Sequence, residues 1–172
     1  KPAVIYADGM LEWQHNGAIH RDNNLPAIVM NDRQYWLRHG KYARTDGGPT
    51  LVHTNGKQIW HLGIKIGRED DLPAIIEPDG TKKWFVDGQL GREYGPAVIE
   101  ADGTRKWYKD GLIHRDNDLP AIVEATGKRI WCRGGVIHRD DDRPAIIEAD
   151  GTQRWIRRGY PSRDDNQPVV VT

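Results

Sequence analysis

Tryptophan recurs along this chain at an almost constant interval. Successive tryptophans are separated by 23 or 24 residues and stand at Trp13, Trp36, Trp60, Trp84, Trp107, Trp131 and Trp155. A period in the twenties is typical of one small supersecondary unit stacked on copies of itself, because each unit is too small to bury its own apolar face. The chain is therefore expected to be an internal repeat throughout the printed sequence.

Prolines keep the same interval and place a strand at the start of each repeat. Eight of the ten prolines open a short run of mostly β-branched residues, such as Ala97-Val98-Ile99. Such runs after proline, with no apolar spacing of 3.6, favour strands over helices. The repeats start near Pro2, Pro26, Pro49, Pro73, Pro96, Pro120 and Pro144, with a final strand at Pro168.

These patterns predict an all-β fold in a single repeat domain over residues 1–172. Seven copies of an antiparallel β-hairpin, each 23 or 24 residues long, would form an elongated meander that is either open or curled. Two copies are each one residue shorter in a loop. The second copy leaves Asn31-Asp32-Arg33 as a three-residue loop, and the fourth has the short acidic loop Arg92-Glu93-Tyr94-Gly95-Pro96.

A first turn precedes each tryptophan, as in Asp102-Gly103. Asp-Gly and Asn-Gly are the preferred dipeptides of two-residue type I′ hairpins, so a two-residue turn is expected. In the register that such a turn sets, acidic residues lie opposite basic residues on the neighbouring strand. The expected partners are Glu100 with Arg105, Val98 with Trp107, Glu77 with Lys82, and Glu124 with Arg129.

A second glycine turn follows each tryptophan, as in Asn16-Gly17 and Asp110-Gly111, and is least regular in the third copy at Gly63. Counting outward from it pairs apolar residues on one face and tryptophan with histidine on the other. With both faces apolar, the meander is expected to fold back so that one of them becomes a core. The expected pairs are Tyr108 with Ile113, Phe85 with Leu90, Leu37 with Tyr42, Cys132 with Ile137, Trp107 with His114, Trp13 with His20, and Trp131 with His138.

Composition excludes several kinds of protein. The 25 basic and 25 acidic residues cancel, which disfavours nonspecific nucleic-acid binding. No apolar stretch approaches the roughly 20 residues of a membrane helix. The single cysteine, Cys132, excludes an intrachain disulfide and is expected to be a small core residue.

The two ends of the chain suggest further expectations. The chain begins at Lys1, directly before a strand, so a mature fragment or one domain of a longer protein is expected. The cytoplasm or a virion is favoured, although the compartment itself is not predicted. The terminal strands, Ala3–Tyr6 and Val169–Val171, lack polar caps, so self-association through them is expected alongside a protein partner.

One run of residues resembles a known repeat family. Trp107-x-x-x-Gly111-x-x-His114-Arg115, followed by Ala121 to Gly127, resembles a MORN-type repeat in the divergent Trp-Gly-His-Arg form of bacterial, phage and giant-virus proteins. It lacks the usual Tyr-x-Gly-x-Trp opening, and its tryptophan stands four residues before the glycine instead of three. The resemblance implies an elongated β-meander used as a scaffold or interaction platform, sometimes at membranes.

The repeated polar residues have structural and binding interpretations. The arginine after each second turn, such as Arg115, is expected to bond loop acids or lie on a tryptophan face. The histidines facing tryptophan are expected to stack on it. The acidic loops offer an alternative calcium site, but the adjacent arginine competes with a cation. The calcium candidates are Asp116, Asp118, Asp140 and Asp142.

Basic residues flank the tryptophans and form a possible binding stripe. Such a stripe could hold phosphate, a sugar or single-stranded nucleic acid, or the opposite acids could neutralise it. The candidate binding residues are Trp84, Trp107, Trp131, Lys82, Arg105, Lys109, Arg129 and Arg133.

Catalysis is disfavoured because nearly every polar residue is a repeated one, whereas an active site needs one asymmetric constellation. The His-Arg-Asp triplet of kinase catalytic loops occurs three times without a Gly-rich loop or Asp-Phe-Gly. The sequence thus favours a noncatalytic scaffold or protein–protein interaction module without a cofactor. The alternatives are a module binding carbohydrate or anionic lipid on the Trp-basic face, and a phage or viral structural or accessory protein.

Overall fold

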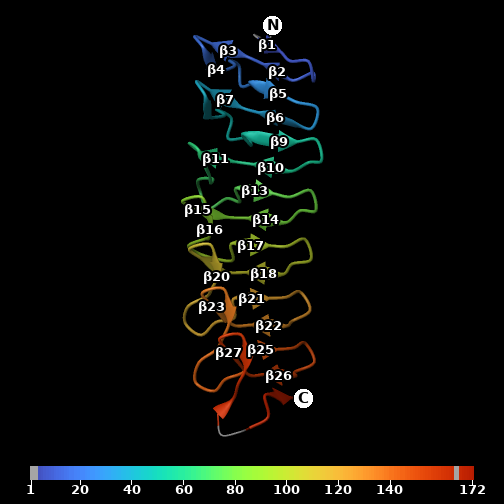
Figure 1. Ribbon diagram of the computed structural model, residues 1–172, viewed down its shortest axis with the longest axis vertical. Coiled ribbons are helices and arrows are strands. Elements are labelled where there is room, and N and C mark those ends of the chain that lie inside the picture. Colours follow the sequence, from blue (N-terminus) through green and yellow to red (C-terminus); the bar gives the residue numbers. More distant parts are fainter. Residues whose placement is uncertain (1–3, 165–166) are drawn as a thin grey trace. The chain divides into compact units, whose positions relative to one another are not determined.

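The computed structural model describes residues 4–164 and 167–172, and these residues form an all-β protein of antiparallel hairpins. The chain divides into two compact units, Lys1–Gly88 and Gln89–Thr172, each containing several of the predicted repeats. Within each unit the main strands follow one another in sequence order (Figure 1). No helix long and apolar enough to cross a membrane occurs among the described residues.

In the first unit the main strands pair in the order in which they occur along the chain. They are β1 (Val4–Ile5), β2 (Leu11–Glu12), β5 (Ile28–Val29), β6 (Arg33–Tyr35), β9 (Leu51–His53), β10 (Gln58–Ile59), β13 (Ile75–Ile76) and β14 (Lys82–Lys83). Short hairpins leave this sheet after a tryptophan. They are β3 (Gln14–His15) with β4 (Ala18–Ile19), β7 (Leu37–Arg38) with β8 (Lys41–Tyr42), and β11 (His61–Leu62) with β12 (Lys65–Ile66), and β15 (Phe85–Val86) ends the unit.

The second unit begins with β16 (Gln89–Leu90) and repeats the same plan. Its main strands are β17 (Val98–Ile99), β18 (Arg105–Lys106), β21 (Ile122–Val123), β22 (Arg129–Ile130), β25 (Ile146–Ile147), β26 (Gln153–Arg154) and β29 (Val170–Val171). Its short hairpins are β19 (Tyr108–Lys109) with β20 (Leu112–Ile113), β23 (Cys132–Arg133) with β24 (Val136–Ile137), and β27 (Ile156–Arg157) with β28 (Tyr160–Pro161).

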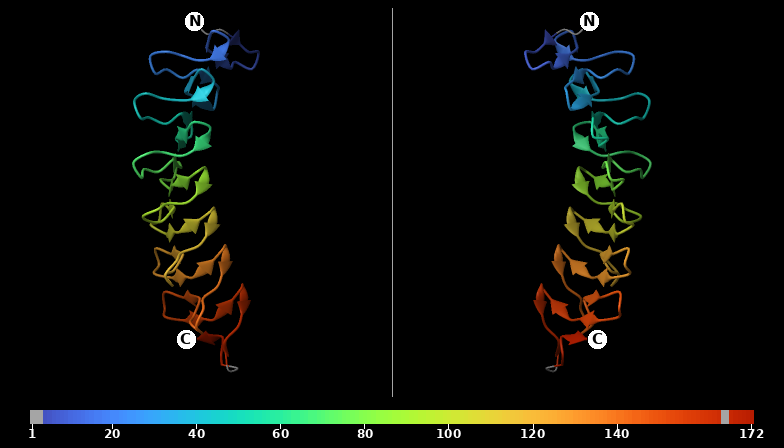
Figure 2. Two further views of the ribbon diagram at one scale, coloured as in Figure 1. Left: turned by 90° about the vertical axis from the view of Figure 1, so that its left-hand side faces the viewer. Right: turned by 90° about the vertical axis from the view of Figure 1, so that its right-hand side faces the viewer.

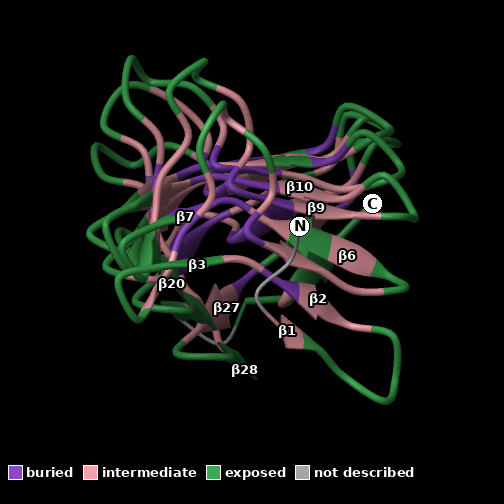
Figure 3. Cartoon of the chain, turned by 90° about the horizontal axis from the view of Figure 1, so that it is seen from above, coloured by how far each residue is buried: buried purple, intermediate pink, exposed green. Residues whose placement is uncertain are grey.

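The short hairpins fold back toward the main sheet, as expected from a ribbon with two apolar faces. In the first unit Leu51, Ile59 and Ile75 form a buried cluster, and Ile66 and Phe85 of the short hairpins pack against it. Figure 2 shows main strands and short hairpins side by side in each unit, and Figure 3 shows that the turns are exposed. Burial is therefore concentrated where main strands meet short hairpins.

The first turn differs from the predicted two-residue type. Val98 lies opposite Lys106 and Ile99 opposite Arg105, so the predicted pairing of Glu100 with Arg105 is wrong by one residue. The N–H of Glu100 donates to the carbonyl of Thr104 at 2.9 Å, which leaves a three-residue loop closed by Gly103 at φ +91°. A type I turn with a G1 bulge has this form.

The same correction applies to the other first turns. Lys82 lies opposite Ile76 instead of Glu77, and Arg129 lies opposite Val123 instead of Glu124. The second repeat, being one residue shorter, has the two-residue loop that was predicted elsewhere. Val29 pairs with Gln34, and the N–H of Met30 donates to the carbonyl of Arg33 at 2.9 Å, so the three-residue loop predicted there is wrong.

The second turn has the predicted register. Tyr108 pairs with Ile113, Leu37 with Tyr42, and Cys132 with Ile137. The third copy keeps this register, with its turn at Gly63 and Ile64. The tryptophan–histidine pairs are also confirmed, because the backbone N–H groups of His20, His114 and His138 donate to the carbonyls of Trp13, Trp107 and Trp131.

Candidate functional site

Arginine stacks on tryptophan in repeats of both units, as the sequence predicts. In the second unit the guanidinium carbon of Arg139 lies 3.9 Å from the ring centroid of Trp131, and Arg115 lies 3.8 Å from that of Trp107. The same arginines donate to the carbonyl of the next repeat-opening proline, at 3.1 Å for Arg139 and Pro144. The arginine is thus fixed by a ring on one side and a backbone acceptor on the other.

Most tryptophans are also bonded through the indole N–H to the preceding loop. The donor Nε1 reaches a backbone carbonyl 12 or 13 residues upstream. The pairs are Trp36 with Asn24, Trp60 with Gly47, Trp84 with Asp71, Trp131 with Asp118 and Trp155 with Asp142, at 2.8–2.9 Å. Of the tryptophans predicted to bind a ligand, Trp84 and Trp131 are only 7% and 6% exposed, so they offer little surface to one.

Three of the predicted basic residues lie on the main sheet, on exposed strand positions. Arg105 has Ile99 and Val123 as its cross-strand neighbours, and Arg129 has Val123 and Ile147. Directly opposed residues share a face. We call these five residues of the second unit the outer stripe. Lys82 holds the equivalent position in the first unit, opposite Ile76.

The two arginines of the outer stripe are exposed, and neither has a carboxylate partner among the described residues. Glu100, which was predicted opposite Arg105, binds Lys106 instead. Glu124, which was predicted opposite Arg129, accepts a hydrogen bond from the Thr126 hydroxyl at 3.2 Å. Burial and the nearby charge of Arg105 both lower the pKa of the Arg115 guanidinium. The positive charge on this face is therefore not neutralised locally.

The other two predicted basic residues lie on short hairpins and are paired with loop acids. Lys109 Nζ lies 3.0 Å from Asp116, and Arg133 Nη1 lies 2.7 Å from Asp140. Both pairs are exposed, so each contributes little to stability. Lys109 and Arg133 thus lie apart from the outer stripe and belong to the hairpin surface.

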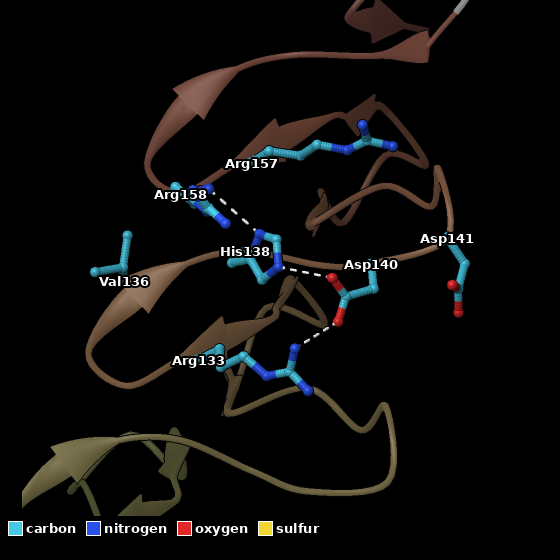
Figure 4. A pocket seen from close by; sticks show the side chains of 7 residues that line it. All are labelled: Arg133, Val136, His138, Asp140, Asp141, Arg157 and Arg158. Carbon is cyan, nitrogen blue, oxygen red and sulfur yellow. Dashed lines mark hydrogen bonds and ion pairs between the residues drawn. The ribbon is translucent and has the colours of Figure 1, made fainter.

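The histidines connect consecutive repeats by hydrogen bonds. His138 Nε2 lies 2.9 Å from Asp140, and the backbone N–H of Arg158, in the next repeat's turn, donates to His138 Nδ1 at 3.2 Å (Figure 4). His114 and His20 make the same pair of contacts. None of these three rings stacks on a tryptophan, so the predicted stacking is wrong; the guanidinium occupies the ring face instead.

The four calcium candidates are occupied by cations or backbone donors of the protein. Asp116 and Asp140 bind histidine and a basic side chain, while Asp118 accepts two bonds from Arg139 at 2.9 and 2.7 Å. Asp142 accepts the backbone N–H of Asp164 at 3.0 Å. No group of three or more His, Cys, Asp or Glu side chains that could hold a metal ion occurs in residues 4–164 and 167–172.

One residue that sequence reasoning did not select is Tyr94, in the short fourth loop. Its side chain is 79% exposed, and it lines a cavity of about 540 Å³ with Trp107, Lys109 and His114. The hydrogen bond and charge of Glu93 raise the pKa of the Tyr94 hydroxyl. The sequence does indicate this position, because the loop that contains Tyr94 is one residue shorter than the equivalent loops of the other repeats.

The fold and these surfaces define a class, an all-β protein of tandem antiparallel hairpins. Comparison with protein-family models finds no family that matches this chain, and comparison with curated proteins finds no similar sequence.

Proposed function

We propose that this protein is a noncatalytic interaction module, built from MORN-like hairpin repeats, that binds an acidic protein surface through the outer stripe. The observation that carries this proposal is the pair of exposed arginines, Arg105 and Arg129, that lack carboxylate partners. Arginine is enriched at protein interfaces and among the residues that contribute most to binding.

The spacing of the outer stripe fits a regular partner. Arg105 and Arg129 are separated by one intervening strand, which places them roughly 10 Å apart at the usual strand spacing. Ile99, Val123 and Ile147 lie between and beside them and add half-buried aliphatic surface. A partner with acidic residues on either side of an apolar strip would meet both features.

A charge-reversal experiment tests this proposal with a defined probe. A fluorescein-labelled decapeptide of alternating glutamate and valine is titrated with the full chain in low salt, and binding is followed by fluorescence anisotropy. Arg105→Glu combined with Arg129→Glu is expected to weaken binding at least about 30-fold, since two charged contacts are lost.

The matched control reverses the charge of two arginines elsewhere in the same unit. Arg133→Glu combined with Arg158→Glu changes net charge equally but alters the short hairpins around the cavity in Figure 4. This control is expected to keep binding within about 3-fold of the unmodified chain. Equal losses in both double variants, or no loss in the first, would refute a role for the outer stripe.

A further inference from the structure

Trp107 differs from the other tryptophans of the second unit. Trp131 and Trp155 are buried, and each donates its indole N–H to a loop carbonyl at 2.8–2.9 Å. Trp107 is only half-buried, and within the described residues its Nε1 has no hydrogen-bond acceptor. Its ring is still covered on one face by Arg115 at 3.8 Å. The stack is thus intact, while the indole N–H is left without an acceptor from the described residues.

The cause is the loop that precedes this tryptophan. In the loop before Trp131, Asn117 and Asp118 adopt positive φ angles of 61° and 54°, which brings the Asp118 carbonyl to the indole. The loop before Trp107 is one residue shorter and has only Gly95 at positive φ, 157°. Tyr94 stands 13 residues before Trp107 but does not have a positive φ, and no carbonyl of the described loop is bonded to the Trp107 indole.

A cavity lies beside Trp107 that is larger than its counterpart of about 380 Å³ beside Trp131, where the loop has its full length. This cavity, of about 540 Å³, is within the range of small-ligand sites. We call it the Trp107 pocket, and its walls include Glu93, Tyr94, Trp107, Lys109, His114 and Asp116. It combines aromatic rings, among them those of Tyr94 and Trp107, with both donors and acceptors.

Several charged side chains around the Trp107 pocket are already engaged within the protein. Lys109 Nζ is 3.0 Å from Asp116, His114 Nε2 is 2.9 Å from the same carboxylate, and Arg115 donates to the Pro120 carbonyl at 3.2 Å. An anionic ligand would meet the carboxylates of Glu93 and Asp116 together with these engaged donors. A neutral ligand rich in hydroxyl groups avoids that conflict.

We propose that the Trp107 pocket binds a neutral pyranose sugar. The exposed ring of Tyr94 offers an apolar surface to the C–H face of the sugar, and the Trp107 indole N–H donates to a ring hydroxyl. Sugar hydroxyls both donate and accept, so they also suit the carboxylate and ammonium groups of the wall. The site is separate from the outer stripe and does not depend on the function proposed for it.

The indole N–H itself reports binding. The full chain is labelled with ¹⁵N, and the indole resonance of Trp107 is identified by its loss in Trp107→Phe. Cellobiose, maltose, lactose and N,N′-diacetylchitobiose are each titrated to about 50 mM, a concentration high enough to detect a weak site. At least one sugar is expected to shift the Trp107 resonance in a saturable way, while the Trp131 and Trp155 resonances stay in place.

Two variants connect the shift to the pocket. Tyr94→Ala is expected to weaken binding about 10-fold, as expected for removing an aromatic contact of this kind. Tyr160→Ala is the matched control, because Tyr160 is also highly exposed, at 75%, but lies on another hairpin of the same unit. It is expected to leave the affinity unchanged.

A loop repair gives an independent test. Replacing Glu93-Tyr94-Gly95 by Asp-Asn-Asp-Leu recreates the loop that precedes Trp131 and retains Arg92 and Pro96. This variant is expected to slow hydrogen exchange of the Trp107 indole and to abolish the sugar-induced shift. The proposal is overturned if no sugar of the panel shifts Trp107, or if the repaired loop or Tyr94→Ala binds as tightly as the unmodified chain.

Discussion

Replacing Arg139 by alanine tests whether the arginine–tryptophan stack stabilises the repeats. Its side chain is 13% exposed and makes three kinds of contact, with the Trp131 ring at 3.9 Å, the Pro144 carbonyl at 3.1 Å, and Asp118 at 2.9 and 2.7 Å. A cation–π contact contributes about 1 kcal/mol, a charged hydrogen bond about 1.5–2, and a partly exposed ion pair about 0.5–1. The free energy of unfolding should therefore fall by about 3–4 kcal/mol.

Urea unfolding followed by tryptophan fluorescence and by circular dichroism measures this loss. With a slope near 2 kcal/mol per molar, the midpoint should fall by about 1.5–2 M. Coincident transitions by the two methods are needed to convert midpoints into free energies. Arg139→Lys keeps the charge but loses the planar fork, so about half of the loss is expected.

The control for this measurement is Arg133→Ala, in the neighbouring short hairpin. Arg133 is 65% exposed and has one ion pair, with Asp140 at 2.7 Å, so its loss should cost less than about 1 kcal/mol. If Arg139→Ala costs no more than Arg133→Ala, the stack is an incidental contact and the reasoning fails.

The remaining predictions concern the pH dependence of stability and the reactivity of the cysteine thiol. The hydrogen bonds from Arg139 lower the pKa of Asp118, so the stability that this carboxylate supplies is present above its unfolded pKa near 3.9 and is lost as the pH falls further. The difference in urea midpoint between the unmodified chain and Asp118→Asn should thus be large at pH 6 and shrink toward pH 3; a constant difference would contradict it. Burial raises the pKa of the Cys132 thiol to about 11, so Ellman's reagent at pH 8 should react at least about 100-fold more slowly with the folded chain than with the urea-unfolded chain. Equal rates would show that the thiol is accessible.

The two glycine turns show how far sequence could predict register. Asp110-Gly111 forms the expected two-residue turn, with φ angles of 52° and 76°. Asp102-Gly103 has the same letters but closes a three-residue loop, in which Asp102 accepts the backbone N–H and the hydroxyl of Thr104 at 2.8 and 3.1 Å. The threonine is not what sets the loop length, because Asn55-Gly56 and Thr126-Gly127, each followed by lysine, close loops of the same size.

For the candidate site, the sequence predicted which residues are exposed more reliably than it predicted their interaction partners. The exposed positions of Arg105 and Arg129 follow from strand alternation. That they have no acidic partner among the described residues depends on the register, which differs by one residue from the predicted one. The histidine contacts could not be predicted from pairing within a repeat, since the acceptor Nδ1 of His138 meets a backbone donor 20 residues away. Such contacts are set by the stacking of one repeat on the next.

The tryptophan of each repeat divides its contacts between two segments, and this division bears on how such a chain can evolve. Arg115 covers Trp107 from a position eight residues downstream, whereas the indole N–H depends on the loop upstream. A deletion in the upstream loop therefore removes one hydrogen bond and leaves the stack in place. Loss of a single codon can thus enlarge the cavity beside one tryptophan, while the other copies keep the fold.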